Sequence, residues 1–326
     1  MQIFDLTPSS ALGQAVAQDA GCPLSALEVR RFRGGQHKIR PLVSVRGQDV
    51  FIVAALHAAD GASTNDLLIQ LLFFIATCRD HGARRITAVV PWLPYARKDR
   101  VTKARDPVSS RYVAQLFDAV GTDAVVTVDV HNPAAFQNGF RCQTVHLQST
   151  RLFATEIAAR AGEGPIVVMS PDSGGVKRAE VLRQSVEMLL NRPTAFAFME
   201  KHRSQGLISG TLFAGTVTDQ DVWIVDDMID SGETMLRAAN ACRERGALTV
   251  HVLATHALCR IEETASLQDP AIDTITVTDS AMNLGGGAEH GRIITLSLAP
   301  IIGQCLARMH RGQAVSPVLD PTGLTR

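Results

Sequence analysis

Short β-branched runs alternate with amphipathic helical patterns along most of the chain, and this alternation constrains the fold more than any other feature. Residues 50–54 and 86–90 have the composition of buried strands. Between them, four apolar residues follow the i, i+3, i+4, i+7 spacing of a helix: Leu68, Leu71, Leu72 and Ile75. The alternation restarts after residue 150, with strands predicted at 166–169 and 222–225. We therefore predict an α/β protein with mostly parallel sheets flanked by helices.

The 326 residues suffice for two domains of ordinary size. The sequences at 78–83 and 242–247 are similar, each with a predicted helix end, a glycine and a new strand. This similarity indicates either two related halves or a coincidence between two helix-to-strand turns. We expect one domain over residues 1–149, a second over 150–300, and a C-terminal helix with a loose tail over 301–326.

Charge and cysteine content narrow the classes of partner and compartment. The 32 basic and 32 acidic residues give no net charge, whereas a nucleic-acid or anionic-membrane binder carries an excess of basic residues. The longest apolar stretch, residues 67–76, is too short to span a bilayer. Six scattered cysteines form no Cys-x-x-Cys pair, and no signal-peptide pattern is visible. We expect a cytoplasmic protein with reduced thiols that binds neither nucleic acid nor membrane.

The segment 225–234 links a predicted strand to a predicted helix through a turn of small residues. The first backbone N–H groups and the positive dipole end of such a helix suit a phosphate. Asp226 and Asp227 end the strand, where open α/β sheets bind ligands, and could hold ribose hydroxyls or a magnesium shell. The alternative is a plain helix cap made by Asp230 or Ser231.

A second glycine turn, Gly174-Gly175, follows the strand predicted at 166–169. Adjacent glycines allow the backbone to approach an anion closely, and Asp172 just before them can ligate Mg²⁺ directly or through water. The alternative is an ordinary strand-to-helix turn.

Two further features follow strands predicted in the N-terminal half. A basic run from residue 97 to residue 105 could clamp a polyphosphate, since guanidinium groups bind phosphate oxygens in pairs, or could be a solvated surface loop. His131 follows the strand predicted at 125–128 and could coordinate a metal or serve as an ordinary hydrogen-bonded residue.

Together these segments resemble the ribose-phosphate pyrophosphokinases, or PRPP synthetases, over nearly the whole chain. The matching landmarks keep their order: Ser-Val-Arg-Gly-Gln-Asp-Val at 44–50, Pro-Tyr-Ala-Arg-Lys-Asp-Arg at 94–100, Pro-Val-Ser at 107–109, Thr-Val-Asp-Val-His at 127–131, Ser-Pro-Asp-Ser-Gly-Gly at 170–175, and the segment 225–234. The last also marks type I phosphoribosyltransferases in general.

The resemblance implies two tandem phosphoribosyltransferase-like domains, with the nucleotide side in the first and the ribose 5-phosphate side in the second. It implies transfer of the β,γ-diphosphoryl group of ATP to the C1 hydroxyl of ribose 5-phosphate, with Mg²⁺ as cofactor. The family commonly forms dimers and hexamers, so we expect self-association.

The resemblance also implies roles for individual residues. Matched motif by motif, Lys201 and Arg203 would be catalytic; Phe32, Gly34, Gln36, Arg97 and Lys98 would bind the nucleotide; Asp226, Asp227, Asp230, Ser231, Gly232, Glu233 and Thr234 would bind ribose 5-phosphate; and His131 and Asp172 would hold Mg²⁺. Without the resemblance, residues 201–203 are a short basic patch that we would place in a loop.

Four positions depart from the family pattern. Gly34 and Gln36 stand where the family usually has polar acceptors that recognise adenine; glutamine can still pair with a base edge, whereas glycine offers no side chain. Lys98 replaces the usual glutamine and adds a charge beside the nucleotide. Glu233 stands where glycine is common, and we expect its carboxylate to point outward so that its backbone N–H stays available.

These departures leave three hypotheses. The first is an active PRPP synthetase, or a close relative that uses another nucleotide or phosphosugar. The second is a non-catalytic regulatory homologue. The third is a phosphoribosyltransferase that consumes PRPP, which the N-terminal landmarks fit poorly.

Overall fold

In a computed structural model, the chain forms two compact units. The first contains Met1–Leu147 and Ser297–Leu319, and the second contains Gln148–Asp279 and the strands between residues 289 and 296. The structure describes residues 1–7, 11–58, 61–204, 207–281 and 289–320, without the side chains of residues 201–211, 289 and 290.

The first unit is built on a five-stranded parallel sheet with the order β1-β4-β5-β6-β7. A separate antiparallel hairpin, β2-β3, lies against α2. The strands of the first unit are β1 (Gln2–Asp5), β2 (Leu27–Arg31), β3 (His37–Pro41), β4 (Asp49–Val53), β5 (Arg85–Val89), β6 (Ala124–Val128) and β7 (Gln143–Leu147). Its helices are α1 (Leu12–Asp19), α2 (Thr64–Asp80), α3 (Ser109–Ala119), α4 (Pro133–Gly139), α8 (Ala299–His310) and α9 (Ser316–Leu319).

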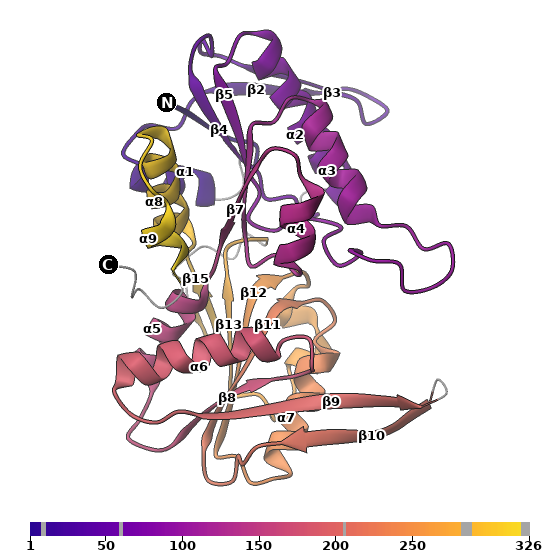
Figure 1. Cartoon of the computed structure of the whole chain (residues 1–326), viewed down its shortest axis with the longest axis vertical. Helices are drawn as coiled ribbons and strands as arrows, with labels where there is room; N and C mark the ends of the chain where they lie inside the picture. The colour runs from indigo at the N-terminus through magenta and orange to yellow at the C-terminus, as the bar shows by residue number, and fades with distance from the viewer. Residues whose placement is uncertain (8–10, 59–60, 205–206, 282–288, 321–326) are drawn as a thin grey trace. The chain divides into compact units, whose positions relative to one another are not determined.

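The second unit is built on an eight-stranded sheet with the order β10-β9-β8-β11-β12-β13-β15-β14, antiparallel only at its two outermost pairs. Its strands are β8 (Ile166–Ser170), β9 (Ala195–Ser204), β10 (Leu207–Ala214), β11 (Asp221–Ile229), β12 (Thr249–Ala257), β13 (Thr274–Thr278), β14 (Glu289–His290) and β15 (Ile293–Leu296). Its helices are α5 (Thr150–Arg160), α6 (Val176–Leu190), α7 (Glu233–Arg243), and the 3₁₀ turns η1 (Ile261–Glu263) and η2 (Ala265–Leu267). In Figure 1, β9 and β10 extend from the edge of this sheet as a long ribbon.

The central strands β4, β6 and β8 are buried along their whole length, as expected for parallel strands that helices cover on both faces. The α/β class with mostly parallel sheets flanked by helices is therefore confirmed. All six cysteines are free thiols, as expected. No helix in the described ranges is long and apolar enough to cross a membrane.

The helix-to-strand turn after α2 is held by one arginine–aspartate pair. Gly82 adopts the left-handed conformation, with φ of +82°, and turns the chain toward β5. Arg79, in the last turn of α2, pairs through Nη2 with Asp123 and donates from the same nitrogen to the Gly121 carbonyl at 2.5 Å. Asp123 also accepts the backbone N–H of Ile86 at 2.7 Å. One carboxylate thus joins a helix end to the beginning of a strand.

The turn after α7 repeats this geometry. Gly246 has φ of +81°, Arg243 donates to Asp273 at 2.5 Å, and Asp273 accepts the backbone N–H of Val250 at 2.6 Å. Arg243 also donates to the Ala271 carbonyl at 3.1 Å. The two similar sequence segments therefore form the same motif, which supports the interpretation that the halves are related.

The C-terminal helix α8 belongs to the first unit, where it lies beside α1 (Figure 1). The Met309 carbonyl accepts a hydrogen bond from Arg85 at 2.8 Å, and the His310 ring contacts Asp49 at 2.9 Å. The expected loose tail is partly wrong, because Ser316–Leu319 forms the short helix α9; residues 321–326 lie outside the described residues.

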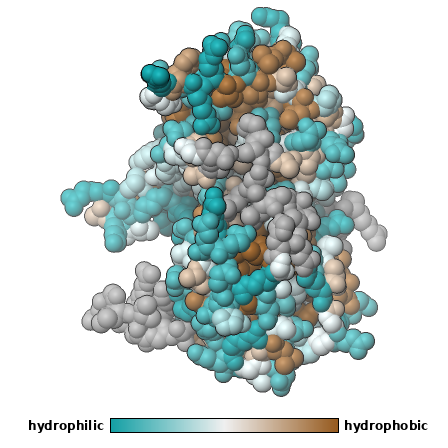
Figure 2. All heavy atoms as spheres, turned by 180° about the vertical axis from the view of Figure 1, so that it is seen from behind, coloured by the Kyte–Doolittle hydropathy of each residue, from teal (hydrophilic) through white to brown (hydrophobic). Residues whose placement is uncertain are grey.

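The surface mixes polar and apolar residues, with the largest apolar area of the face in Figure 2 at its upper end. On the first unit, four large apolar residues stand out from α2 and α3: Ile69, Phe73, Tyr112 and Leu116. Isolated exposed apolar residues are normal on protein surfaces.

Arg79→Ala should lower the free energy of unfolding of the first unit by about 1–2 kcal/mol, because it removes charged hydrogen bonds that remain partly open to solvent. Urea unfolding followed by circular dichroism measures the effect. Arg84→Ala, at an exposed arginine five residues away, is the matched control and should leave the unfolding midpoint unchanged. Equal midpoints for the two variants would contradict the role of the pair.

Candidate active site

The segment that sequence analysis singled out first lies between β11 and α7. Gly232 is the N-cap of α7 and has no side chain with which to make a capping hydrogen bond. The N-cap is therefore neither Asp230 nor Ser231, and the N-terminus of a helix has backbone N–H groups that can bind an anion. Ser231 and Glu233 are exposed and Thr234 is half-buried. Glu233 lines a cavity along α7 together with Arg237 and Asn240, and its outward orientation stays a prediction.

Glycine is required at position 232 for two reasons. Its φ of +74° is strained for other residues, and a Cβ there would lie 2.6 Å from Cγ of Leu267 and Oγ of Ser266. Ser266 Oγ in turn donates to the Ser231 carbonyl at 2.5 Å. The turn η2 therefore braces this loop from behind, a contact that the sequence did not reveal.

Asp226 and Asp227 lie within the last part of β11, which runs four residues beyond the predicted strand. Arg178 Nη1 donates to Asp226 Oδ1 at 3.0 Å, and its Nη2 lies 3.7 Å from Asp227 Oδ2. Burial and the neighbouring Asp227 carboxylate raise the pKa of Asp226 above its ordinary value, although Arg178 opposes this shift. The two carboxylates thus share one cation in a largely buried place.

Asp172 lies in the adjacent glycine turn, between β8 and α6. Its Oδ1 accepts the backbone N–H of Gly175 at 3.0 Å, and its charge contributes to the raised pKa of Asp226. Its Oδ2 has no hydrogen-bond partner among the described residues. A Cβ at Gly175 would lie 2.6 Å from Ser170 Oγ, so this turn is also tightly packed. The second unit therefore brings Asp172, Asp226 and Asp227 together.

Within the described ranges, no group of three or more His, Cys, Asp or Glu side chains could hold a metal ion by itself. Mg²⁺ is usually bound by one or two carboxylates together with water and substrate phosphates. The half-free carboxylate of Asp172 offers one such ligand.

In the first unit, Phe32, Gly34 and Gln36 lie in the loop of the β2-β3 hairpin, and all three are exposed. The Phe32 N–H donates to the Gln36 carbonyl at 2.8 Å, which closes the loop. Gly34 has φ of +83° and open space around it, so the backbone conformation of the turn, and not close packing, favours glycine at this position. The hairpin is attached to α2, where the His37 and Phe73 rings lie 5.5 Å apart.

Arg97 and Lys98 follow β5 in a loop that reaches the segment after β6. Arg97 is exposed, and Lys98 is paired with Asp106 at 2.6 Å. Asp99 of this loop accepts a hydrogen bond from Asn132, the N-cap of α4 and the neighbour of the exposed His131. The first unit therefore brings the basic loop and the His131 segment together.

Lys201 and Arg203 lie on strand β9, paired in register with Thr211 and Ile208 of β10. The expectation of a loop at these positions is therefore wrong, because the chain continues in extended, paired form to residue 204. Their side chains lie outside the described part of the structure.

Sequence reasoning missed Arg178 and Asp106 as site residues. Arg178 lies in the first turn of α6, where the helix dipole disfavours a cation unless acidic groups lie nearby, and the sequence did not predict that the helix begins before it. The signal for Asp106 was weaker, since an acidic residue in a basic run has many ordinary explanations.

Asp226→Asn should raise the free energy of unfolding at neutral pH by about 1–2 kcal/mol, because it removes repulsion between buried carboxylates. A folded-state pKa above the unfolded value means that stability falls as the pH rises above about 4, where the unfolded carboxyl ionises first. The gap between variant and wild type should therefore widen from pH 4 upward in urea titrations. Glu262→Gln, at an exposed carboxylate, should show no such widening; a constant gap for Asp226→Asn would refute the assignment.

Comparison with known proteins agrees with this geometry. The family model of the N-terminal domain of ribose phosphate pyrophosphokinase matches residues 1–121, and the phosphoribosyl synthetase-associated domain matches residues 204–319. Ribose-phosphate pyrophosphokinases of Vibrio parahaemolyticus and Maricaulis maris are 33% and 31% identical over 98% of this chain, and they are covered over 99% and 100% of their own lengths.

Among solved structures, the phosphoribosylpyrophosphate synthetase of Mycobacterium smegmatis is 30% identical and has a TM-score of 0.85. The match covers 95% of this chain and 99% of that one. Since such relatives match along nearly their whole lengths, the chain has their phosphoribosyltransferase-like architecture and belongs to the ribose-phosphate pyrophosphokinase family.

Proposed function

We propose that this protein transfers the β,γ-diphosphoryl group of ATP to the C1 hydroxyl of ribose 5-phosphate, giving PRPP and AMP. The observation that carries the proposal is the pairing, in one unit, of a helix N-terminus that begins at a glycine with two carboxylates at the end of the preceding strand. The first binds a phosphate and the second binds hydroxyl groups, so together they suit a phosphorylated sugar.

On this proposal, ribose 5-phosphate is bound by the loop Asp230, Ser231, Gly232, Glu233 and Thr234 through its 5-phosphate, and by Asp226 and Asp227 through its hydroxyls. The rigidity of Gly232 against η2 supports this, because a fixed loop positions a phosphate without an ordering cost on binding. Arg178 reduces the repulsion between the two carboxylates before the sugar binds.

The nucleotide is proposed to be bound by Phe32, Gly34 and Gln36 of the hairpin and by the loop that carries Arg97 and Lys98. The exposed Phe32 ring, with 48% of its surface accessible, offers a stacking face for a base. Asp172 and His131 would hold Mg²⁺, which would neutralise charge on the phosphate oxygens. Self-association and a cytoplasmic location are part of the proposal, the latter supported by the six free thiols.

Diphosphoryl transfer joins the C1 oxygen to the β-phosphorus, breaks the bond between that phosphorus and the α,β-bridging oxygen, and releases the proton of the C1 hydroxyl to solvent. Such reactions depend on positioning and on neutralising charge spread over the phosphate oxygens. Lys201 and Arg203 are proposed to supply this positive charge in the transition state.

Phosphorus NMR with Mg²⁺, ribose 5-phosphate and each common nucleoside triphosphate in turn should show PRPP and one nucleoside monophosphate. Lys201→Ala should lower turnover by about 100-fold or more with the fold intact, because it removes charge that acts on the transition state. Circular dichroism checks the fold. A folded wild type that converts no donor would favour the regulatory homologue, and near-normal turnover of the variant would remove Lys201 from the mechanism.

Use of another nucleotide is the second candidate, favoured by Gly34 and Gln36 at the hairpin loop. If Gln36 reads the base, Gln36→Ala should change the ratio of specificity constants among ATP, GTP and CTP by about three- to tenfold, since it removes hydrogen bonds to a base edge. Lys38→Ala, at an exposed residue of the same hairpin, is the control and should leave that ratio unchanged. An unchanged ratio for Gln36→Ala would place base recognition elsewhere.

A further inference from the structure

The basic loop between β5 and α3 is folded around a single carboxylate. Asp106 Oδ2 accepts hydrogen bonds from Lys98 Nζ at 2.6 Å and from the Thr102 hydroxyl at 2.6 Å. The same oxygen accepts the backbone N–H groups of Thr102 at 3.2 Å and Lys103 at 3.0 Å. Lys98 Nζ also donates to Thr102 Oγ1 at 3.1 Å. We call this set of hydrogen bonds the clasp.

The clasp is stronger than an isolated surface ion pair. The Lys98 ammonium, the Thr102 hydroxyl and the two backbone donors lower the pKa of the Asp106 carboxyl far below its ordinary value. The Asp106 side chain is 21% exposed, and several donors converge on one oxygen, so the pair does not depend on two freely rotating side chains.

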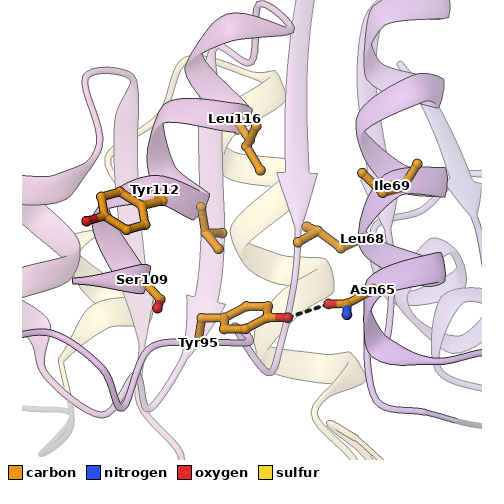
Figure 3. A pocket seen from close by; sticks show the side chains of 8 residues that line it. Asn65, Leu68, Ile69, Tyr95, Ser109, Tyr112 and Leu116 are labelled. Atoms are coloured by element: carbon orange, nitrogen blue, oxygen red, sulfur yellow. Dashed lines mark hydrogen bonds between the residues drawn. The ribbon is translucent and has the colours of Figure 1, made fainter. Parts of the chain in front are cut away.

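The main chain of Lys98 is also held by hydrogen bonds on both sides. The Lys98 N–H donates to the Tyr95 carbonyl at 3.1 Å, and the Lys98 carbonyl accepts the N–H of Ser110, in the first turn of α3, at 3.2 Å. The Tyr95 hydroxyl donates to Asn65 at the beginning of α2 (Figure 3). Lys98 is therefore fixed by its backbone as well as by its ammonium group.

The remaining charges of the loop are divided. Arg100 donates twice to Asp99, at 2.8 Å for both bonds, so that cation is also neutralised within the loop. Within the described residues, the Lys103 and Arg105 side chains make no hydrogen bond or ion pair. The cation at position 98 is thus paired by the loop itself, whereas those at positions 103 and 105 stay available to an anion.

We propose that Asp106 is a positioning residue of the nucleotide site, and that it holds Lys98 so that the loop presents Arg97 to the nucleotide in a fixed conformation. On this proposal, Lys98 is held by Asp106 and does not contact the phosphates. This inference rests on the proposed function, which assigns the loop to the nucleotide.

A double-mutant cycle tests the clasp with Lys98→Gln, Asp106→Asn and the double variant. Calorimetry measures the Kd of Mg-ATP, and steady-state kinetics measure KM for ATP and for ribose 5-phosphate. Each single variant should weaken ATP binding by about three- to tenfold, because either change opens the loop. The double variant should be no weaker than the poorer single variant, since both changes remove the same interaction.

Two comparisons separate positioning from direct contact or from general damage. Lys98→Arg keeps the charge and the pair and should retain the affinity for ATP, while KM for ribose 5-phosphate should change by less than about twofold in every variant. If Lys98→Gln weakens ATP while Asp106→Asn leaves it unchanged or tightens it, Lys98 contacts the nucleotide and the inference is wrong. Additive effects in the double variant would overturn it as well.

Hydrogen exchange gives a readout that does not depend on turnover. The amide protons of Thr102 and Lys103 should exchange faster in both single variants, because each loosens the clasp. Glu156→Gln, which breaks an ion pair on α5 with Arg160, is the matched control and should change neither exchange nor affinity. Unchanged exchange in Asp106→Asn would refute the clasp.

The same measurements distinguish the inference from the proposed function. A wild type that binds ATP but makes no PRPP would overturn the proposed function, whereas the double-mutant cycle would still test the inference through the Kd values of Mg-ATP. A wild type that binds no nucleotide would overturn both.

Discussion

The arginine–aspartate pair at the amino ends of the strands is the interaction on which both units depend. Arg79 and Arg243 leave the last turn of a helix, and each meets an aspartate that also accepts an N–H at the beginning of a strand. A helix end, a turn and a strand start are thereby fixed by one carboxylate, which the guanidinium neutralises. Because this end of each sheet is closed, the carboxyl ends of the same strands remain for binding.

At the carboxyl ends of the strands of the second unit, two neighbouring carboxylates lower the stability of the unbound protein. Asp226 accepts a hydrogen bond from Arg178, and Asp227 lies within ion-pair distance of the same guanidinium, so ionising both carboxylates in a buried place is unfavourable. On the proposed function, sugar hydroxyls would donate to these oxygens and reduce this cost, so the arrangement would favour the bound state over the free one. The close packing of Gly232 against Leu267 serves the same end, because it keeps the helix N-terminus in place.

The fold could be predicted from the sequence because it follows local patterns, whereas the roles assigned to the site residues remain predictions. Alternating periodicity predicted the sheets, and the segment at 225–234 carried its own turn, strand end and helix start. Contacts between distant residues could not be predicted in this way. Nothing local to Arg85 indicates its bond to Met309, and nothing near Ser231 indicates the brace from Ser266. The extended conformation at 201–203 was missed because long-range pairing with β10, and not local propensity, determines it.

A net charge of zero hides how the charges are placed. Lys98 with Asp106, Arg100 with Asp99, and Arg178 with Asp226 are each neutralised within one hydrogen-bonded group. An unpaired cluster of cations would repel itself and stay mobile, and ordering it would then reduce the affinity for a polyphosphate. Pairing some cations with carboxylates of the same loop removes that repulsion and fixes the backbone before the ligand arrives. On the proposed function, the acidic residues in and next to the basic run contribute to anion binding because they hold some of its cations in place.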